Sequence, residues 1–428
     1  MTAARPRAAV LAIGSELLDL GRTDTNSPFI AATLERMGID VVTTTVVGDD
    51  AGELEAAMRQ ALARADLVVC TGGLGPTDDD RTRAVAAALL ALPLHEDPAL
   101  VEAMRARFAA RQLAMPAINR RQALVPAGAT AIANARGTAP GLWIPTPAGA
   151  LLLLPGPPRE MTPMLDEAVV RHIAPRFGVT PSRRRVVIVA GRSESWLDER
   201  LAPIYAPWVA ESPPVRTTVL ASPGVVEVHL SSAGAAAADL DARLATAVAA
   251  LTEPLGEDVV SIDGRSLEQA VGAALVARGW RLGLAESCTG GLVATRLTDV
   301  AGSSAYLDRG VVTYSNGAKT DLLGVPPSLI AAHGAVSEPV ALAMASGMRA
   351  AGGVDVAIAV TGIAGPGGGS DAKPVGTVCI AVDGPSGGDV RTWRFTGDRA
   401  VIRALSATTA IDRLRRYLAR AVPAEPPS

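Results

Sequence analysis

The sequence predicts an α/β protein in which two three-layer α/β/α domains are joined by a small α+β domain. Short apolar runs alternate with helical spacing in residues 1–170 and again in 265–428, the pattern of a parallel sheet covered by helices on both faces. Residues 171–255 instead combine strand-like runs with two helical patterns in a smaller unit. A Pro- and Arg-rich seam at 175–185 and a Pro- and Gly-containing linker at 253–264 mark its ends.

Composition narrows the possible functions. The 428 residues are 49% hydrophobic and 19% charged, with a net charge of −3, so no basic field that would hold nucleic acid is expected. No apolar run approaches the length of a membrane span. Cys70, Cys288 and Cys379 are widely spaced and suggest neither a disulfide framework nor a zinc motif, which fits a reducing compartment. We therefore expect a cytoplasmic protein that contacts neither a membrane nor DNA directly.

In the first domain, strand-like and helix-like segments follow one another without interruption. They are residues 8–13 (strand), 26–37 (helix), 39–47 (strand), 50–62 (helix) and 66–70 (strand). Asp50 and Glu53 form a capping box at the start of the second helix. This alternation predicts a parallel sheet, and the carboxyl ends of its strands are where such sheets place their ligands.

Three loops of this domain follow strands and carry polar residues. They are 14–16, with Asp24 and Asn26 beyond it; 71–76, with Asp78, Asp79 and Asp80 beyond it; and 155–160, which contains Arg159. Glycines such as Gly72 and Gly73 let backbone N–H groups approach a phosphate, and Arg159 can pair with a phosphate oxygen. Carboxylates can hold Mg²⁺, although an acidic cluster that favours a helix N-terminus explains residues 78–80 equally well. Together, the loops favour a nucleotide or phosphate pocket.

These loops lie in longer motifs: GSELL (14–18), TGGLGPTDDD (71–80), NRRQA (119–123), GTAPG (137–141) and LPGPPRE (154–160). The motifs resemble the N-terminal domain of the CinA family, which is related to the MogA/MoeA molybdopterin-binding fold. The resemblance implies a pyrophosphatase that hydrolyses ADP-ribose to AMP and ribose 5-phosphate with Mg²⁺ or a similar divalent metal ion, and with K⁺ as a further ion. The metal and phosphate residues that it implies are Glu16, Asp24, Asn26, Asp78, Asp79 and Asp80. Relatives of this fold also bind molybdopterin without hydrolysing it, so a binding protein is the alternative.

The middle segment carries no catalytic cluster. It reads as a strand at 186–190, a helix at 194–201, a strand at 225–230 and a helix at 239–251. The segment resembles the KH-like middle domain of CinA proteins, but no G-x-x-G clamp for nucleic acid stands in a convincing place. A spacer or a dimerisation role is therefore expected.

The third domain contains the stretch around which its chemistry is organised, residues 282–291. A short buried strand leads into Glu286, Ser287, Cys288 and Thr289, and Gly290-Gly291 then opens a helical pattern. A strand, a glycine turn and a helix start can expose a nucleophile, with free N–H groups of the helix ready to hold an oxyanion. The alternative is that Ser287 or Thr289 simply caps the helix.

A nucleophilic serine needs a base, and a lysine is the candidate in this domain. Lys319 follows a strand predicted at 311–314, and a buried lysine can lose its proton near neutral pH. His333 is the only histidine of the domain, and its surroundings favour packing or a turn. Cys288 is a competing nucleophile, but it has no histidine partner in the pattern, and a buried structural cysteine is the better interpretation.

Long motifs cover nearly all of this domain: AESCTGG (285–291), GSSAYLDRGVVTYSN (302–316), HGAVSEP (333–339), TGIAGPGGGS (361–370), KPVGTV (373–378) and GDR (397–399). They resemble the PncC family of nicotinamide-nucleotide amidases, which forms the C-terminal domain of CinA. The resemblance implies Ser287 as nucleophile, Lys319 as base, Tyr314 and Thr361 in a hydroxyl network, and Arg399 on the substrate phosphate. It also implies backbone contacts to the oxyanion or nucleotide from Gly290, Gly291, Gly362 and Gly365.

The sequence thus predicts two sites that act on products of NAD breakdown. The C-terminal site would hydrolyse nicotinamide mononucleotide to nicotinic acid mononucleotide and ammonia without a cofactor, and the N-terminal site would hydrolyse ADP-ribose. The resemblance also implies a homodimer. The rival hypothesis is a non-catalytic protein that binds a pterin or a nucleotide and assists DNA uptake, as the family's competence-related name suggests.

Overall fold

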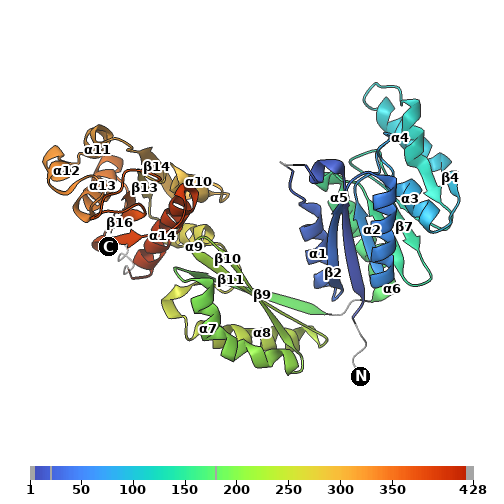
Figure 1. Cartoon of the computed structure of the whole chain (residues 1–428), viewed down its shortest axis with the longest axis horizontal. Coiled ribbons are helices and arrows are strands. Elements are labelled where there is room, and N and C mark those ends of the chain that lie inside the picture. Colours follow the sequence, from blue (N-terminus) through green and yellow to red (C-terminus); the bar gives the residue numbers. More distant parts are fainter. Residues whose placement is uncertain (1–4, 20–21, 179–180, 421–428) are drawn as a thin grey trace. The chain divides into compact units, whose positions relative to one another are not determined.

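The computed structural model describes residues 5–19, 22–178 and 181–420 (Figure 1). The chain forms two compact units. The first comprises Met1–Arg183 with Ala233–Leu240, and the second comprises Arg184–Ser232 with Asp241–Ser428. Each unit is described by itself below.

The first unit contains a six-stranded sheet in the order β2-β1-β3-β8-β7-β6. Its strands are β1 (Arg7–Ile13), β2 (Asp40–Val47), β3 (Leu67–Thr71), β6 (Thr130–Ile132), β7 (Gly141–Pro145) and β8 (Ala150–Leu154). The first four strands in this order are parallel, and β7 and β6 are added antiparallel. The carboxyl ends of β1, β3 and β8 therefore lie at one edge of the sheet, as the sequence predicts.

Helices cover both faces of this sheet, because successive strand residues point to opposite sides. Ala8 and Val10 pack with α1 (Asn26–Arg36) and α5 (Pro158–Ala168). Ala9 and Leu11 pack with α2 (Ala51–Arg64) and α3 (Thr82–Leu89) on the other face. The remaining elements are η1 (Ser15–Leu17), β4 (Leu94–Glu96), α4 (Pro98–Ala109), η2 (Ala117–Ala123), β5 (Leu124–Pro126), η3 (Val169–Ile173) and α6 (Ala174–Phe177). The three-layer prediction is confirmed.

One detail agrees with the sequence prediction and another differs from it. Asp50 caps α2 by accepting hydrogen bonds from the N–H groups of Gly52 and Glu53, which confirms the predicted helix start. The domain, however, continues beyond residue 170, because Ile173 is part of the buried core and α6 packs against it. The predicted boundary at 170 therefore cuts into a continuous packed segment.

The second unit begins with a small sheet in the order β10-β11-β9-β12. Its elements are β9 (Ser182–Ala190), α7 (Glu194–Tyr205), η4 (Ala206–Ala210), β10 (Val215–Ser222), β11 (Val225–Ala233), α8 (Ala237–Thr252), η5 (Gly256–Asp258) and β12 (Val259–Ser261). Leu197, Val228 and Leu244 are fully buried in its core. Because β12 pairs with β9, this α+β segment extends past the predicted end at 255.

The rest of the unit is a five-stranded sheet in the order β14-β13-β15-β16-β17. Its strands are β13 (Leu282–Glu286), β14 (Leu307–Val312), β15 (Val356–Gly362), β16 (Thr377–Gly384) and β17 (Gly387–Arg394). Strands β14, β13 and β15 are parallel, and β16 and β17 are antiparallel. The carboxyl ends of the three parallel strands thus meet at one edge.

Because side chains alternate between the two faces of this sheet, the domain has two hydrophobic cores, one on each face. Leu284 and Ile358 pack with α9 (Leu267–Arg278), α10 (Leu292–Thr298) and α14 (Arg399–Arg420). Ala285 and Ala357 pack with α13 (Glu338–Gly352) on the other face. Two helices, α11 (Asn316–Leu323) and α12 (Pro327–His333), and the 3₁₀ turn η6 (Ser303–Ala305) complete the domain. The second three-layer prediction is also confirmed.

Within the described part of the chain, no helix is both long and apolar enough to cross a membrane.

Candidate functional site

Ser287 lies directly after β13, where the parallel strands end. Its N–H donates to the carbonyl of Val360 at 2.9 Å, which extends the pairing of β13 with β15 by one residue. The side chain is 8% exposed and lines a cavity of about 190 Å³. The structure therefore places Ser287 at a strand tip that opens into a pocket, as the sequence predicts.

The helix that follows is capped by neither Ser287 nor Thr289. The buried carboxylate of Glu286 accepts hydrogen bonds from the N–H groups of Gly291 (2.9 Å), Val293 (3.1 Å) and Ala294 (2.8 Å). These donors belong to the first turn of α10, so a carboxylate from the chain itself occupies the anion position at this helix end. The expectation that these N–H groups are free to hold an oxyanion is wrong.

Replacing Glu286 by alanine is expected to destabilise the second unit by about 3 kcal/mol, because three charge-assisted hydrogen bonds are lost and their donors become unsatisfied. Thermal unfolding of Glu286→Ala checks this. Glu286→Gln is the matched control, since its amide retains one acceptor oxygen, and its loss should be intermediate. An alanine variant that unfolds at the wild-type temperature would contradict this role of Glu286.

Lys319 lies beside Ser287. It is carried by α11, whose first turn is capped by the hydroxyl of Ser315, rather than by a strand end. Its Nζ is 3.2 Å from Ser287 Oγ and 2.8 Å from the carbonyl oxygen of Thr313. The residue is 1% exposed, and burial lowers the pKa of the Lys319 amine below its usual value. A neutral amine in this position can accept the proton of the serine hydroxyl.

Cys288 does not compete as a nucleophile. It is 5% exposed, and burial raises the pKa of its thiol to about 12. The thiol therefore stays protonated at neutral pH, and the thiolate is the nucleophilic form. The structure agrees with the interpretation of Cys288 as a buried structural cysteine.

The remaining predicted residues surround the cavity but do not form one hydroxyl network. Thr361 is buried and donates to the carbonyl of Ala335 at 2.9 Å. Tyr314 is 63% exposed, and its hydroxyl accepts a hydrogen bond from Arg399 at 3.1 Å. Neither hydroxyl bonds to Ser287 or Lys319 within the described residues, so the expected network is wrong at this point. Asn316 also lines the cavity, and the sequence reasoning did not single it out.

Arg399 is held at the mouth of the cavity by two contacts. Its guanidinium donates to the carbonyl of Gly365 at 2.7 Å as well as to Tyr314. Gly362 lines the cavity, and a Cβ there would lie 3.0 Å from Cys288 Sγ, so glycine leaves room for the close approach of two loops. Gly290, by contrast, donates its N–H to the carbonyl of Ser287. Thus the N–H groups of Gly290 and Gly291 are both hydrogen-bonded within the turn.

The first unit has its own cavity, of about 510 Å³, at the carboxyl ends of β1, β3 and β8. All three predicted loops contribute to it. Gly72 and Gly73 adopt positive φ angles of 114° and 63°. A Cβ at Gly72 would lie 2.0 Å from the carbonyl oxygen of Ile13, and one at Gly73 would lie 2.2 Å from Thr82 Oγ1. Only glycine fits here, because the loop passes directly against the neighbouring strand and helix.

The six expected metal residues do not form one cluster. Asp78 pairs with Arg121, and Asp80 accepts hydrogen bonds from the N–H groups of Gly75 and Thr77. Asp24 accepts from the N–H groups of Asn26 and Ser27 at the start of α1. Asp79 lines the cavity, and a hydrogen bond with the Thr77 side chain lowers the pKa of its carboxyl. Across residues 5–19, 22–178 and 181–420, no group of three or more His, Cys, Asp or Glu side chains is arranged to hold a metal ion. The six residues therefore do not converge on one position, and their role in binding a metal ion stays a prediction.

A metal held by one or two protein oxygens nevertheless fits the site. The amide nitrogen of Asn26 donates to Thr71 Oγ1 and to the carbonyl of Gly156, whereas its buried Oδ1 has no hydrogen-bond partner. Asn26 and Glu16 line an adjoining cavity of about 600 Å³, and Glu16 lines the first cavity as well. Mg²⁺ commonly takes one or two such oxygens and leaves its other positions to water and phosphate.

The structure adds residues that the sequence reasoning missed. Besides Arg159, the cavity is lined by Arg107, Arg111, Arg136 and the buried Glu160. Arg107 is tied to the carbonyls of residues 134, 135 and 137, whereas Arg111 and Arg159 donate no side-chain hydrogen bond to any described residue. Two unpaired guanidinium groups beside a glycine loop form a site suited to phosphate oxygens. Glu160 stands in the LPGPPRE motif, which is the signal that could have revealed it.

Comparison with known proteins finds matches to both α/β/α domains and relatives that align with 96% of the chain. The family model described as "CinA C-terminal domain" matches residues 264–418, and the one described as "Probable molybdopterin binding domain" matches residues 9–175. A protein of Symbiobacterium thermophilum is 45% identical over 425 residues, which are 96% of this chain and 98% of that protein. A CinA-like protein of Koribacter versatilis is 44% identical over 415 residues, 96% of this chain and 99% of its own length. A crystal structure of a competence-damaged protein (CinA) superfamily member from Klebsiella pneumoniae is 42% identical; the match covers 36% of this chain and 97% of that one, with a TM-score of 0.35.

Proposed function

The chain belongs to the CinA family, and from that premise we propose that its C-terminal domain is an amidase that hydrolyses nicotinamide mononucleotide to nicotinic acid mononucleotide and ammonia. The observation that carries the proposal is the buried pair of Lys319 Nζ and Ser287 Oγ, 3.2 Å apart, in a cavity at the ends of the parallel strands. An amine that burial makes easier to deprotonate, next to a hydroxyl, is the arrangement of a Ser-Lys hydrolase.

The proposed reaction has two halves. Ser287 Oγ attacks the carboxamide carbon while Lys319 takes the hydroxyl proton. The tetrahedral intermediate then collapses as Lys319 gives that proton to the amide nitrogen, which leaves as ammonia. Water then attacks the resulting ester, again with Lys319 accepting and returning a proton, and releases the carboxylate product. The carbonyl of Thr313, 2.8 Å from Nζ, keeps the amine directed at Ser287 throughout.

Arg399 supports a nucleotide rather than a free amide as the substrate. A cavity of about 190 Å³ is too small for a whole mononucleotide, so the nicotinamide ring would enter it and the ribose phosphate would lie at its mouth. Arg399 stands at that mouth, positioned by Gly365 and Tyr314, with donor groups left for a phosphate.

The amidase proposal is tested by ammonia release from nicotinamide mononucleotide, with and without a chelator, and with free nicotinamide as the comparison substrate. We expect release from the nucleotide that the chelator leaves unchanged, and slow or no release from nicotinamide, which lacks the phosphate. Equal rates from the two substrates would contradict the role given to Arg399, and no ammonia from either would contradict the amidase.

For the N-terminal domain, we propose hydrolysis of ADP-ribose to AMP and ribose 5-phosphate in the cavity of about 510 Å³. The combination of the Gly72-Gly73 turn with the unpaired Arg111 and Arg159 favours a diphosphate ligand there. Asn26 and Glu16 would hold the divalent metal ion, which, when bound, neutralises phosphate charge and lowers the pKa of a bound water. Arg111 and Arg159 would hold the phosphate oxygens in place.

Replacing Arg159 by alanine is expected to lower kcat/KM for AMP release by about tenfold or more, the worth of one charge-assisted hydrogen bond. AMP release from ADP-ribose with added Mg²⁺ measures this. Arg105→Ala is the control, because Arg105 lies on α4 in an exposed contact with Glu102 and does not line the cavity. Absence of AMP release with Mg²⁺ or Mn²⁺, combined with measurable nucleotide or pterin binding, would favour the non-catalytic alternative.

A further inference from the structure

The second unit contains another cavity, of about 600 Å³, which shares no lining residue with the Ser287 cavity. It lies between α14, β17 and the β10–β11 hairpin, where Thr408 donates to the carbonyl of Pro223 at 2.9 Å. Nothing in the proposed amidase reaction uses it. Its walls combine two chemistries, an apolar and aromatic part and an arginine-rich part.

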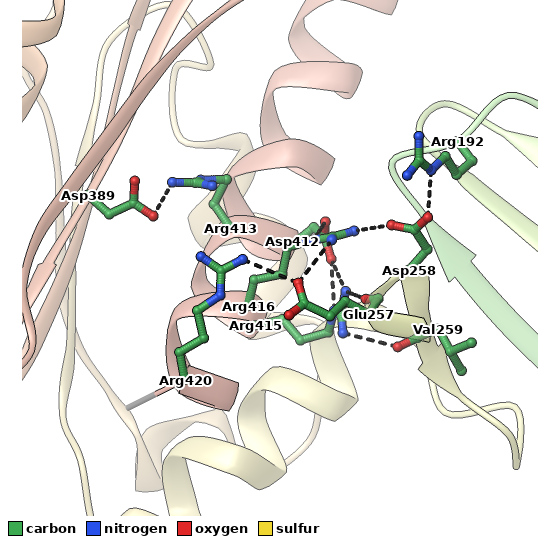
Figure 2. A network of polar contacts seen from close by, with 10 residues as sticks. All are labelled: Arg192, Glu257, Asp258, Val259, Asp389, Asp412, Arg413, Arg415, Arg416 and Arg420. Atoms are coloured by element: carbon green, nitrogen blue, oxygen red, sulfur yellow. Dashed lines mark hydrogen bonds and ion pairs between the residues drawn. The ribbon is translucent and has the colours of Figure 1, made fainter. Parts of the chain in front are cut away.

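One side of this cavity is built from arginines that are paired with carboxylates (Figure 2). Asp412 accepts hydrogen bonds from Arg415 (2.8 Å) and Arg416 (2.7 Å). Asp258 accepts from Arg192 (2.5 Å) and again from Arg416 (2.9 Å). Burial alone would raise the pKa of Asp258, but the hydrogen bonds from Arg192 and Arg416 lower this pKa below its usual value, which favours the ionised carboxylate. This network ties α14 to the small sheet, and each of its guanidinium groups is paired with a carboxylate.

The other side carries an excess of positive charge. Arg413 is 8% exposed and lines the cavity; it contacts Asp389, but its Nε has no hydrogen-bond partner. Figure 2 shows its guanidinium directed at that single carboxylate. Arg391, two residues along β17 from Asp389, is exposed and has no ion pair or side-chain hydrogen bond with any described residue. Two guanidinium groups thus line a cavity in which only one of them is paired with a carboxylate, Asp389, and that one is almost completely removed from water.

Aromatic surface lies next to this charge. Trp393 follows Arg391 on the same face of β17, since alternate residues of a strand share a face. The guanidinium of Arg413 lies 5.6 Å from the centre of the Trp393 ring. Phe395 and Leu405 extend the apolar wall. A flat apolar surface beside two donors of bidentate hydrogen bonds matches a ligand that has a planar ring at one end and an anion at the other.

We propose that this cavity is a binding site for a nucleoside monophosphate, with its phosphate on Arg391 and Arg413 and its base against Trp393 and Phe395. The volume of about 600 Å³ lies in the range of small-molecule sites and is ample for a mononucleotide. The site is independent of the amidase and of the proposed pyrophosphatase, since it shares residues with neither cavity. The α14 helix contributes to it and also carries Arg399 to the Ser287 cavity.

The test is calorimetric titration of the full chain with AMP, adenosine and inorganic phosphate, for the wild type, Arg391→Gln and Arg394→Gln. Arg394 is the matched control, because it is exposed on the same strand but points to the opposite face and does not line the cavity. We expect Arg391→Gln to weaken AMP binding at one site about tenfold or more, and Arg394→Gln to leave it unchanged. Any AMP bound by the first unit is common to all three proteins, so the difference between the two variants isolates this cavity.

Each outcome decides the proposal. The proposal is supported if adenosine and phosphate each bind more weakly than AMP and if, of the two variants, only Arg391→Gln loses AMP affinity. Identical AMP titrations for the wild type and Arg391→Gln overturn it. Phosphate that binds as tightly as AMP contradicts the role of the aromatic wall, and adenosine that binds as tightly contradicts the role of the arginines. Ammonia release by Arg391→Gln without added AMP is measured in parallel, so that a failure of the amidase proposal is recognised separately.

Discussion

Replacing Ser287 by alanine is expected to abolish ammonia release from nicotinamide mononucleotide, with kcat lowered by about 10³- to 10⁶-fold, because no other group near Lys319 can form the covalent intermediate. Lys319 keeps its contact with Thr313 in this variant, so the fold should survive. Ammonia release and circular dichroism measured on the same preparation check both statements.

Cys288→Ala is the matched control for that experiment. The thiol is buried and protonated, so its removal should change kcat by less than about tenfold. Loss of activity in Cys288→Ala with retention in Ser287→Ala would reverse the assignment of the nucleophile. AMP release from ADP-ribose should be intact in both variants. A variant that lost both AMP release and ammonia release would contradict two independent sites.

Replacing Lys319 by methionine is expected to lower kcat by about 10²- to 10⁴-fold with little change in KM, because the general base is lost while the residues around the substrate stay in place. Lys319→Arg is the more demanding comparison. It keeps a positive charge and hydrogen-bond donors, but a guanidinium cannot give up its proton at neutral pH. Activity in Lys319→Arg close to that of the wild type would contradict the role of Lys319 as a base.

The pH profile follows from the direction of the Lys319 pKa. Burial lowers this pKa, so the neutral, active form of the amine is reached at a lower pH than for an exposed lysine. In the wild type, kcat/KM should rise with pH and level off above the lowered pKa. The residual activity of Lys319→Met should lack this rise. The same rising limb in both proteins would assign it to another group.

The sequence was sufficient to predict both three-layer domains and the location of Ser287. Strand and helix periods are local properties, and Ser287 follows a buried strand directly. Lys319 could be nominated by residue type, but its distance from Ser287 depends on how α11 packs, which no local pattern contains. The sequence reasoning placed Lys319 beyond a strand and did not assign it to a helix.

The role of Glu286 could not be predicted from the motif. A carboxylate before a glycine turn can face solvent, a ligand or the helix that follows, and only the packed side chain decides among these. In this chain the Glu286 carboxylate accepts hydrogen bonds from the N–H groups of Gly291, Val293 and Ala294. The predicted oxyanion donors were therefore already occupied, since the N–H of Gly290 donates to the carbonyl of Ser287 and the N–H of Gly291 donates to Glu286.

The same limit explains the first unit. The acidic run at residues 78–80 looked like a metal site because only residue types were visible, whereas Asp78 pairs with Arg121 and Asp80 with backbone donors of its own loop. Conversely, Arg111 joins the cavity from the turn after α4, outside every recognised motif. Charged side chains that only the tertiary structure brings together cannot be recognised from local sequence patterns.

The burial of Lys319 has a practical consequence for chemical modification. Only two of the 40 lysine and arginine residues are lysine, the buried Lys319 and the half-buried Lys373, so a reagent that acylates side-chain amines has two targets in the sequence. An amine with a lowered pKa reacts at neutral pH, provided that the reagent is small enough to enter. A compact acylating agent should therefore inactivate the amidase stoichiometrically, and a bound nucleotide should shield Lys319 while Lys373 stays open to labelling.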